Sequence, residues 1–416
     1  MIVGTLVVFL LSAIAPPMVG NVALAASVPT LTAQSAVLID TDTGQILYSL
    51  NRNTRRPMAS TTKMMTALLA VELSGLAEVA TVRSSHLVGG TTAGLKSGER
   101  MTIRNLLYSL MLPSGNDAGM TIADYVGRTY LDGGQTGGIA AFVRAMNSRA
   151  QQLGLTNTHF TNPHGLDAQG HYSSALDLAR LGRVVLRYPV LATIVNASTM
   201  QATGTLNGYT VYHNLVNTNR NLCEFPGTYG MKTGWTPNAG GVLVASSRRG
   251  TARLTAVVIG STGYSSFADT RALFRWGYAQ RGETSPARAT CQESAHSTVY
   301  TGTWNMRYDS SYSGGFVRHA SAAGVKAAFS FTNSSVSWVA PKGPSRGKAR
   351  VYLDGVYAAT VDLYASTYQA QQVIFTRTGL EASKRHTLEI RVLGTRNPNS
   401  SGTRIDVDAF VVQGRG

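Results

Sequence analysis

Apolar and polar positions recur with different periods along the chain, and the change of period divides it into two regions. In the first region, alternating and helical spacings predict a hairpin at 36–48 and helices at 60–71, 102–126, 142–153 and 174–188. They then predict strands at 241–245 and 254–259 and a last helix at 270–280. The sequence at 113–116 interrupts the second of these helices. Strand, helices, strands and helix in this order predict an α+β fold with an antiparallel sheet.

Beyond Thr301 the pattern is that of short strands only. Asp354-Gly355 separates two alternating segments, which is a strong hairpin signal, and alternation returns at 388–392 and 405–409. Residues 284–299 are small and polar, as in a linker. The pattern therefore predicts an α+β domain at 27–283, a linker at 284–299 and an all-β sandwich at 300–416.

The first residues have the composition of a targeting segment. Residues 2–15 are uncharged and mostly apolar, but a bilayer span takes about 20 residues. Small residues follow at Ala23, Ala25 and Ala26, as at a signal cleavage site. This predicts a signal peptide at 1–26 and a location outside the cytoplasmic membrane. Because the first basic residue is Arg52, an uncleaved N-terminal anchor stays an alternative.

Charge and cysteine content narrow the classes of partner. The formal net charge is +16 and charged residues make up only 14% of the chain, so anionic polymers are expected to be attracted. The basic residues are scattered and no nucleic-acid-binding signature is present, which excludes nucleic acid as the expected partner. Cys223 and Cys291 can pair in an oxidising compartment, and the sequence leaves this open. No metal site or other cofactor is expected.

Three short motifs follow one another in the first region. They are Ser60-Thr61-Thr62-Lys63, Ser114-Gly115-Asn116 and Lys232-Thr233-Gly234. Each motif alone is weak, because a lone serine at a helix start is commonly an N-cap and Ser-Gly-Asn is a common turn. Their order and separation make a joint coincidence improbable, so we interpret them as one catalytic site.

The residue types suit acyl transfer to a serine. Ser60 and Lys63 share one helix face, and a neutral lysine amine can take the proton of the serine hydroxyl. Burial and a second positive charge, expected from Lys232, lower a lysine pKa. Ser114 can relay a proton to the leaving group, and Asn116 can hold Lys63 or a substrate carbonyl.

The third motif suits peptide binding. Gly234 lets a substrate backbone approach closely, so that a peptide can pair with the strand edge. The backbone N–H groups at the start of the Ser60 helix can stabilise an oxyanion.

With their flanks, these motifs resemble the D-alanyl-D-alanine carboxypeptidases among the low-molecular-mass penicillin-binding proteins. The resemblance covers residues 35–283, and its segments are 57–67, 112–118, 162–173 and 230–236. It implies a fold of the β-lactamase and penicillin-binding-protein type, with helices on both sides of an antiparallel sheet. It also implies a peptidoglycan peptide as substrate, covalent inhibition by β-lactams and no cofactor.

The resemblance assigns roles residue by residue. Ser60 is the nucleophile and Lys63 its proton acceptor, and Ser114 and Asn116 assist. The remaining matches form the substrate-binding strand: Lys232, Thr233, Gly234, Trp235 and Thr236. In the resemblance, Lys232 and Thr233 bind the terminal carboxylate of the substrate. The backbone N–H groups of Ser60 and Trp235 form the oxyanion hole. His164 and His171 receive no catalytic role and are expected to be structural.

Two departures from the family are visible. Some members carry an arginine near the substrate carboxylate, where this chain has Ser266. Endopeptidase activity on cross-links is therefore an alternative to carboxypeptidase activity. The second departure is the end of the chain, where residues 405–416 have the pattern of a strand and a short polar tail rather than that of an anchoring helix. Residues 301–416 weakly resemble carbohydrate-binding modules. A wall glycan is accordingly a candidate partner, although Trp304 and Trp338 are expected in the core.

Two other classes are weaker alternatives. A β-lactamase needs a carboxylate that activates the deacylating water, and no glutamate is convincingly placed for it. A non-catalytic wall-binding protein on the same scaffold is disfavoured by the intact motifs.

Overall fold

An antiparallel sheet forms the centre of the first region. The structure is a computed structural model and describes residues 27–132, 134 and 137–414, so the predicted signal peptide at 1–26 lies outside the described residues. The strands pair in the order β2-β1-β9-β8-β7. They span, in this order, Ile46–Leu50, Ser35–Asp40, Ala252–Ser261, Gly240–Arg249 and Thr228–Thr236.

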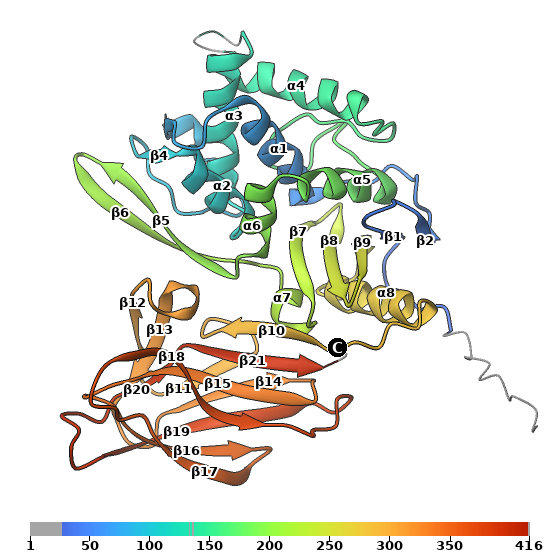
Figure 1. Cartoon of the computed structure of the whole chain (residues 1–416). Coiled ribbons are helices and arrows are strands. Elements are labelled where there is room, and N and C mark those ends of the chain that lie inside the picture. The colour runs from blue at the N-terminus through green and yellow to red at the C-terminus, as the bar shows by residue number, and fades with distance from the viewer. Residues whose placement is uncertain (1–26, 133, 135–136, 415–416) are drawn as a thin grey trace, which may run out of the picture.

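Both faces of this sheet are buried, as predicted. Val37 and Ile39 point into the core formed with the helical cluster, while Ala36 and Leu38 point into the core under α8 (Ser266–Gln280). Successive strand residues face opposite sides, so every residue of β1 is buried. α8 covers one face, and helices α1 to α6 lie on the side of the opposite face (Figure 1). These are α1 (Lys63–Leu73), α2 (Ile103–Met111), α3 (Asn116–Tyr130), α4 (Gly138–Gln152), α5 (Ala175–Val185) and α6 (Pro189–Asn196).

A second small sheet was not expected from the pattern. It consists, in order, of β3 (Val79–Thr81), β4 (Arg100–Thr102), β5 (Thr199–Leu206) and β6 (Tyr209–Val216). β5 and β6 form a hairpin that projects from the body of the molecule (Figure 1).

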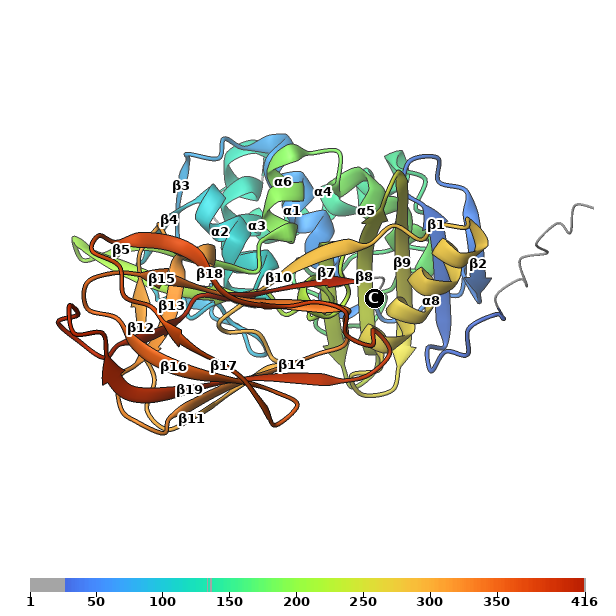
Figure 2. The ribbon, with the colours of Figure 1, turned by 60° about the horizontal axis from the view of Figure 1, so that its bottom comes forward.

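The C-terminal strands form a sandwich, as predicted. One layer contains β10 (Ala287–Gln292), β21 (Ala409–Gly414), β15 (Ser335–Lys342) and β18 (Gln369–Arg377). The other contains β11 (Thr298–Thr301), β14 (Lys326–Phe331), β19 (His386–Arg396), β16 (Gly347–Leu353) and β17 (Val356–Asp362). Smaller strands β12 (Asn305–Tyr308), β13 (Phe316–Ala320) and β20 (Ile405–Val407) close one end. The layer with β10 and β21 lies nearer the helical region (Figure 2).

The sandwich core is aromatic. Phe329 of β14 stacks on Phe410 of β21, with ring centroids 4.3 Å apart. Trp338 is fully buried beside them, and Trp304 packs edge-on against Tyr300. Both tryptophans therefore contribute to the core, as expected.

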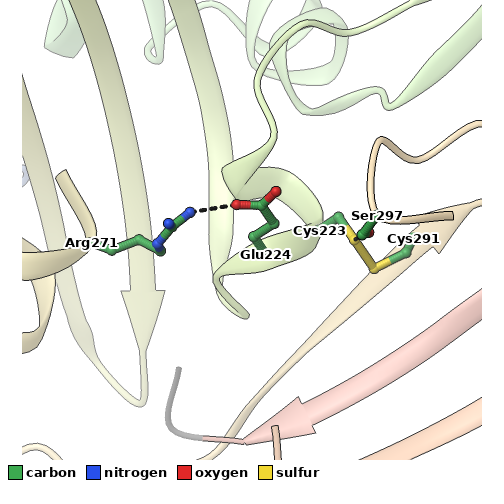
Figure 3. The surroundings of a disulfide bond; sticks show 5 residues. All are labelled: Cys223, Glu224, Arg271, Cys291 and Ser297. Atoms are coloured by element: carbon green, nitrogen blue, oxygen red, sulfur yellow. Dashed lines mark hydrogen bonds and ion pairs between the residues drawn. A yellow bond between two sulfur atoms is a disulfide. The ribbon is translucent and has the colours of Figure 1, made fainter. Parts of the chain in front are cut away.

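The two regions are joined covalently. Cys223, in the short helix α7 (Asn221–Glu224), forms a disulfide with Cys291 of β10 (Figure 3). β10 lies within the segment predicted as a linker and pairs with β21 of the sandwich. The pairing that the sequence left open is thus formed. In the part of the chain that the structure describes, no helix is long and apolar enough to cross a membrane.

Candidate active site

Ser60 lies on a short 3₁₀ turn, η1 (Ala59–Thr62), that leads directly into α1. Thr61 and Thr62 are buried, whereas Ser60 is partly exposed at the border of a cleft. Ala59 has a φ of 47°, an unusual backbone conformation for a residue with a side chain. The turn therefore presents the Ser60 hydroxyl to the cleft while its neighbours anchor it.

Lys63 is fully buried beneath Ser60 and connects three segments of the chain. Its amine contacts Ser60 Oγ at 2.9 Å, Asn116 Oδ1 at 2.8 Å and the carbonyl oxygen of His164 at 2.6 Å. Burial, reinforced by the positive charge of Lys232, holds the pKa of Lys63 well below its ordinary range, and Asp117 opposes this effect. Because its pKa is lowered, a larger fraction of Lys63 is neutral at a given pH. A neutral amine can accept the proton of Ser60.

Ser114 and Asn116 lie in the connection between α2 and α3. Asn116 donates from Nδ2 to the carbonyl oxygen of Gly89 at 2.7 Å, which orients its Oδ1 toward Lys63. Ser114 has a φ of 70° and lines the cleft together with Ser60. Its buried hydroxyl has no hydrogen-bond partner among the described residues. A hydroxyl in this position can exchange protons with a bound substrate.

Asp117 organises the loop in front of this connection, a role that the sequence analysis missed. Its carboxylate accepts hydrogen bonds from Thr92 Oγ1 and from the backbone N–H groups of Ala93, Leu95 and Ala118. Several donors on one buried carboxylate fix the loop firmly. Asp117 thereby supports the cleft wall next to Ser114.

The third motif lies on β7, at the edge of the central sheet. A Cβ added to Gly234 would lie 2.9 Å from Ala59 Cβ and 3.0 Å from Ser60 N. The strand therefore approaches the η1 turn as closely as only glycine allows. Trp235 is 62% exposed and lines the cleft with Thr233 and Gly234.

Lys232 is almost fully buried, and burial lowers its pKa to about 7. Its amine contacts the Thr233 carbonyl oxygen at 3.1 Å. Thr236 is oriented differently, because its hydroxyl donates to Asp167 Oδ1 at 2.8 Å and accepts from Ala239 N at 3.1 Å. The hydroxyl of Thr236, predicted to contact substrate, therefore already makes two hydrogen bonds within the protein.

The loop that carries His164 packs against the nucleophile. Gly165 has a φ of 95°, and an added Cβ would lie 2.0 Å from Ala59 O. His171 shares a 2.8 Å hydrogen bond with Thr62 Oγ1. Burial lowers the pKa of both His164 and His171 to about 4, so both are neutral at pH 7. Both histidines therefore have the surroundings of structural residues.

The cleft between these segments has a volume of about 300 Å³. Ser60, Ser114, Thr233 and Trp235 line it, and no aspartate or glutamate appears among its described lining residues. Within the described ranges, no group of three or more His, Cys, Asp and Glu side chains is placed to hold a metal ion. Arg220 and His296 also line this cleft, and neither was singled out from the sequence.

The fold and this arrangement place the chain in the class of penicillin-binding-protein-like serine peptidase folds. The structure of the Streptomyces K15 DD-transpeptidase matches with a TM-score of 0.58 and 30% identity, over 61% of this chain and 99% of that one. A putative penicillin-binding protein homologue from Mycobacterium tuberculosis matches with a TM-score of 0.56 and 31% identity, over 62% and 95%.

Within this class the sequence comparisons identify the family. The family model described as D-alanyl-D-alanine carboxypeptidase matches residues 22–263. Bacillus subtilis D-alanyl-D-alanine carboxypeptidase DacF is 39% identical over 55% of this chain, and Escherichia coli DacD is 35% identical over 62%. The aligned regions span 58% and 66% of those two relatives. The chain belongs to the D-alanyl-D-alanine carboxypeptidase family.

Proposed function

We propose that this protein is a serine-type D-Ala-D-Ala carboxypeptidase that acts on peptidoglycan stem peptides through an acyl-enzyme on Ser60. The observation that carries the proposal is the 2.9 Å contact between Ser60 Oγ and the buried amine of Lys63. Membership of the carboxypeptidase family supports the choice of substrate.

Acylation proceeds by nucleophilic attack. Lys63 takes the proton of Ser60, and Oγ bonds to the carbonyl carbon of the penultimate D-alanine. The backbone N–H groups of Ser60 and Trp235 stabilise the oxyanion. The C–N bond then breaks, and the terminal D-alanine leaves after its nitrogen receives a proton through Ser114. Lys232 and Thr233 hold the substrate carboxylate.

Deacylation consumes one water molecule. Water adds to the ester carbonyl, its proton returns through Lys63, and Ser60 is released as the alcohol together with the shortened peptide. A β-lactam enters the same path but gives a lasting acyl-enzyme, because no described cleft-lining residue carries a carboxylate that could activate water. We therefore favour a penicillin-sensitive peptidase over a β-lactamase.

Covalent labelling tests this proposal. A fluorescent penicillin should attach to the wild-type protein and fail to attach to Ser60→Ala. Absence of label on the folded wild type would contradict the proposal. Incubation with a D-Ala-D-Ala pentapeptide and with a cross-linked dimer, followed by mass analysis, separates carboxypeptidase from endopeptidase action.

The proposed substrate lies outside the cytoplasm. The disulfide between Cys223 and Cys291 supports an oxidising location, and we propose that the protein is secreted to the cell envelope. The strand sandwich at the C-terminal end is a candidate module for wall glycan, for which exposed tyrosines such as Tyr357 supply stacking surfaces. Cosedimentation of the protein with purified wall glycan tests this assignment.

A further inference from the structure

A large cavity lies at the junction of the two regions, away from the catalytic cleft. Its volume is about 1120 Å³, and ligand sites usually have about 300–1,000 Å³. Thr228 and Tyr229, at the start of β7, line one side, and residues 287–290 of β10 line another. The catalytic cleft is lined by Thr233 and Trp235, nearer the other end of β7. The two sites are therefore separate.

The walls of this cavity are held together from both regions. The disulfide between Cys223 and Cys291 joins α7 to β10 beside it (Figure 3). Thr199 of β5 and Gly314 of the turn before β13 both line the cavity, and Thr199 Oγ1 donates to the Gly314 carbonyl oxygen at 2.9 Å. A preformed site of this kind has less conformational freedom to lose when a ligand binds.

The lining is strongly basic. No aspartate, glutamate or lysine appears among its described residues, and all of its cations are arginines: Arg248, Arg249, Arg253 and Arg288. Two of them have acidic neighbours outside the lining, since Arg253 pairs with Asp42 at 2.8 Å and Arg249 interacts electrostatically with Glu283. The other two decide the net charge of the cavity.

Arg248, at the end of β8, and Arg288, on β10, carry positive charges without a counterion in the protein. Both are exposed, and within the described ranges no acidic side chain forms an ion pair with either. The backbone N–H of Arg248 donates to the Gly227 carbonyl oxygen at 2.9 Å. A Cβ added to Gly227 would lie 3.3 Å from Cβ of Ala287, the residue before Arg288. The two regions thus bring these charges to one junction.

The chemistry of the lining suits phosphate groups on a hydroxylated chain. A guanidinium binds two oxygens of one phosphate, and arginine is preferred to lysine for such bidentate contacts. Ser198 and Thr290 also line the cavity, and their hydroxyl groups can bind those of a polyol or sugar. Tyr229 is the one aromatic residue among the described lining residues, so the cavity has no row of rings on which nucleic-acid bases could stack.

We propose that this cavity binds a segment of a phosphodiester-linked polyol or sugar polymer of the cell envelope, and that Arg248 and Arg288 bind its phosphates. The inference goes beyond the proposed peptidase activity, because no lining residue of the cavity belongs to the catalytic site. A polymer bound there would hold the protein at the wall and leave the cleft with Ser60 open to a peptide.

Fluorescence anisotropy of a labelled glycerol phosphate oligomer of defined length, titrated with the full chain, tests this site. We expect Arg248→Gln/Arg288→Gln to raise Kd at least about tenfold, as for lost charge-assisted hydrogen bonds. The slope of log Kd against log salt concentration should become shallower by about 1 to 2, since two phosphate contacts are removed. Labelling of Ser60 by fluorescent penicillin should stay unchanged, which also shows that the variant is folded.

Arg350→Gln/Arg377→Gln is the matched control. It removes the same charge from two exposed arginines on β16 and β18, outside the cavity lining. Because exposed charges are screened beyond about 8 Å at physiological ionic strength, this variant should bind the oligomer nearly as the wild type does. An equal loss of affinity in both variants would overturn the site, since net charge alone would then attract the polymer.

Three further results would contradict the proposal. The first is a wild type that labels with penicillin but does not bind the oligomer, and the second is an unchanged Kd in Arg248→Gln/Arg288→Gln. The third is binding of single-stranded DNA or of a galacturonate oligomer, matched in charge, as tightly as the glycerol phosphate oligomer. In that case the cavity would not select a phosphodiester-linked polyol. Each of these measurements is independent of peptide cleavage, so the proposed peptidase function is tested separately.

Discussion

Replacing Lys63 by methionine separates a catalytic base from a residue that only orients the nucleophile. The substitution keeps an unbranched side chain and removes the amine that contacts Ser60 Oγ at 2.9 Å. A general base contributes about 10²- to 10⁴-fold to a rate. A neutral hydrogen bond that merely orients Ser60 is worth about 0.5–1.5 kcal/mol, or about 2- to 12-fold. We expect Lys63→Met to slow acylation by at least about 100-fold.

The rate of covalent labelling by fluorescent penicillin measures this step directly. Lys63→Met leaves Asn116 Oδ1 and the His164 carbonyl oxygen without the donor they have at 2.8 and 2.6 Å, so a melting curve must show that the variant is folded at the assay temperature. Lys326→Met serves as the control, because this lysine lies on β14, 3.8 Å from Glu389. Labelling of folded Lys63→Met within about tenfold of the wild type would refute the role as base.

The remaining predictions concern pH and backbone. Burial lowers the pKa of Lys232 to about 7, so its charge is present below this pH and lost above it, and the KM for a free-carboxylate peptide should rise in titrations above pH 7. Asp117→Asn removes the charge that raises the pKa of Lys63, so the rising limb of the acylation–pH profile should move to lower pH; an unmoved limb would contradict the coupling. Gly165→Ala would place Cβ 2.0 Å from the backbone of η1 and should abolish labelling. Gly154→Ala, with a similar positive φ but open space, should cost only about 1–2 kcal/mol of the free energy of unfolding and keep labelling, as denaturant titrations can show.

The sequence predicted the local contacts of the candidate site, but not the contacts between distant segments of the chain. The spacing of Ser60 and Lys63 is local, so their contact follows from helical geometry alone. The contact between Lys63 and the His164 carbonyl oxygen joins residues 101 positions apart, and no periodicity in the sequence predicts such a contact. The same is true of the loop held by Asp117, because most of the partners of this carboxylate are backbone N–H groups, with the Thr92 hydroxyl as the one side chain named above.

For the fold, local signals were informative and long-range pairings were not. Helices α1 to α5, helix α8 and strands β8 and β9 follow the predicted patterns, whereas α6 and α7 were not predicted. The pairing of Ala36 with Val258 depends on how distant strands meet. The β5–β6 hairpin was missed although it has a signal, since Asn207-Gly208 joins two alternating segments and both residues have positive φ. Such a dipeptide is typical of a tight hairpin turn. The sequence could not show that Arg220 and His296 line the same cleft, because this depends on how the two regions pack against each other.

The disulfide between Cys223 and Cys291 closes a ring whose ends are 68 residues apart in sequence, and this ring contains β7, β8, β9 and α8. A single proteolytic nick inside it would leave both fragments on one molecule, with Ser60 on one fragment and His296 on the other. Wherever proteases are present, the protein would thus survive such a cut as a linked pair of chains. Only a reducing gel would reveal the break.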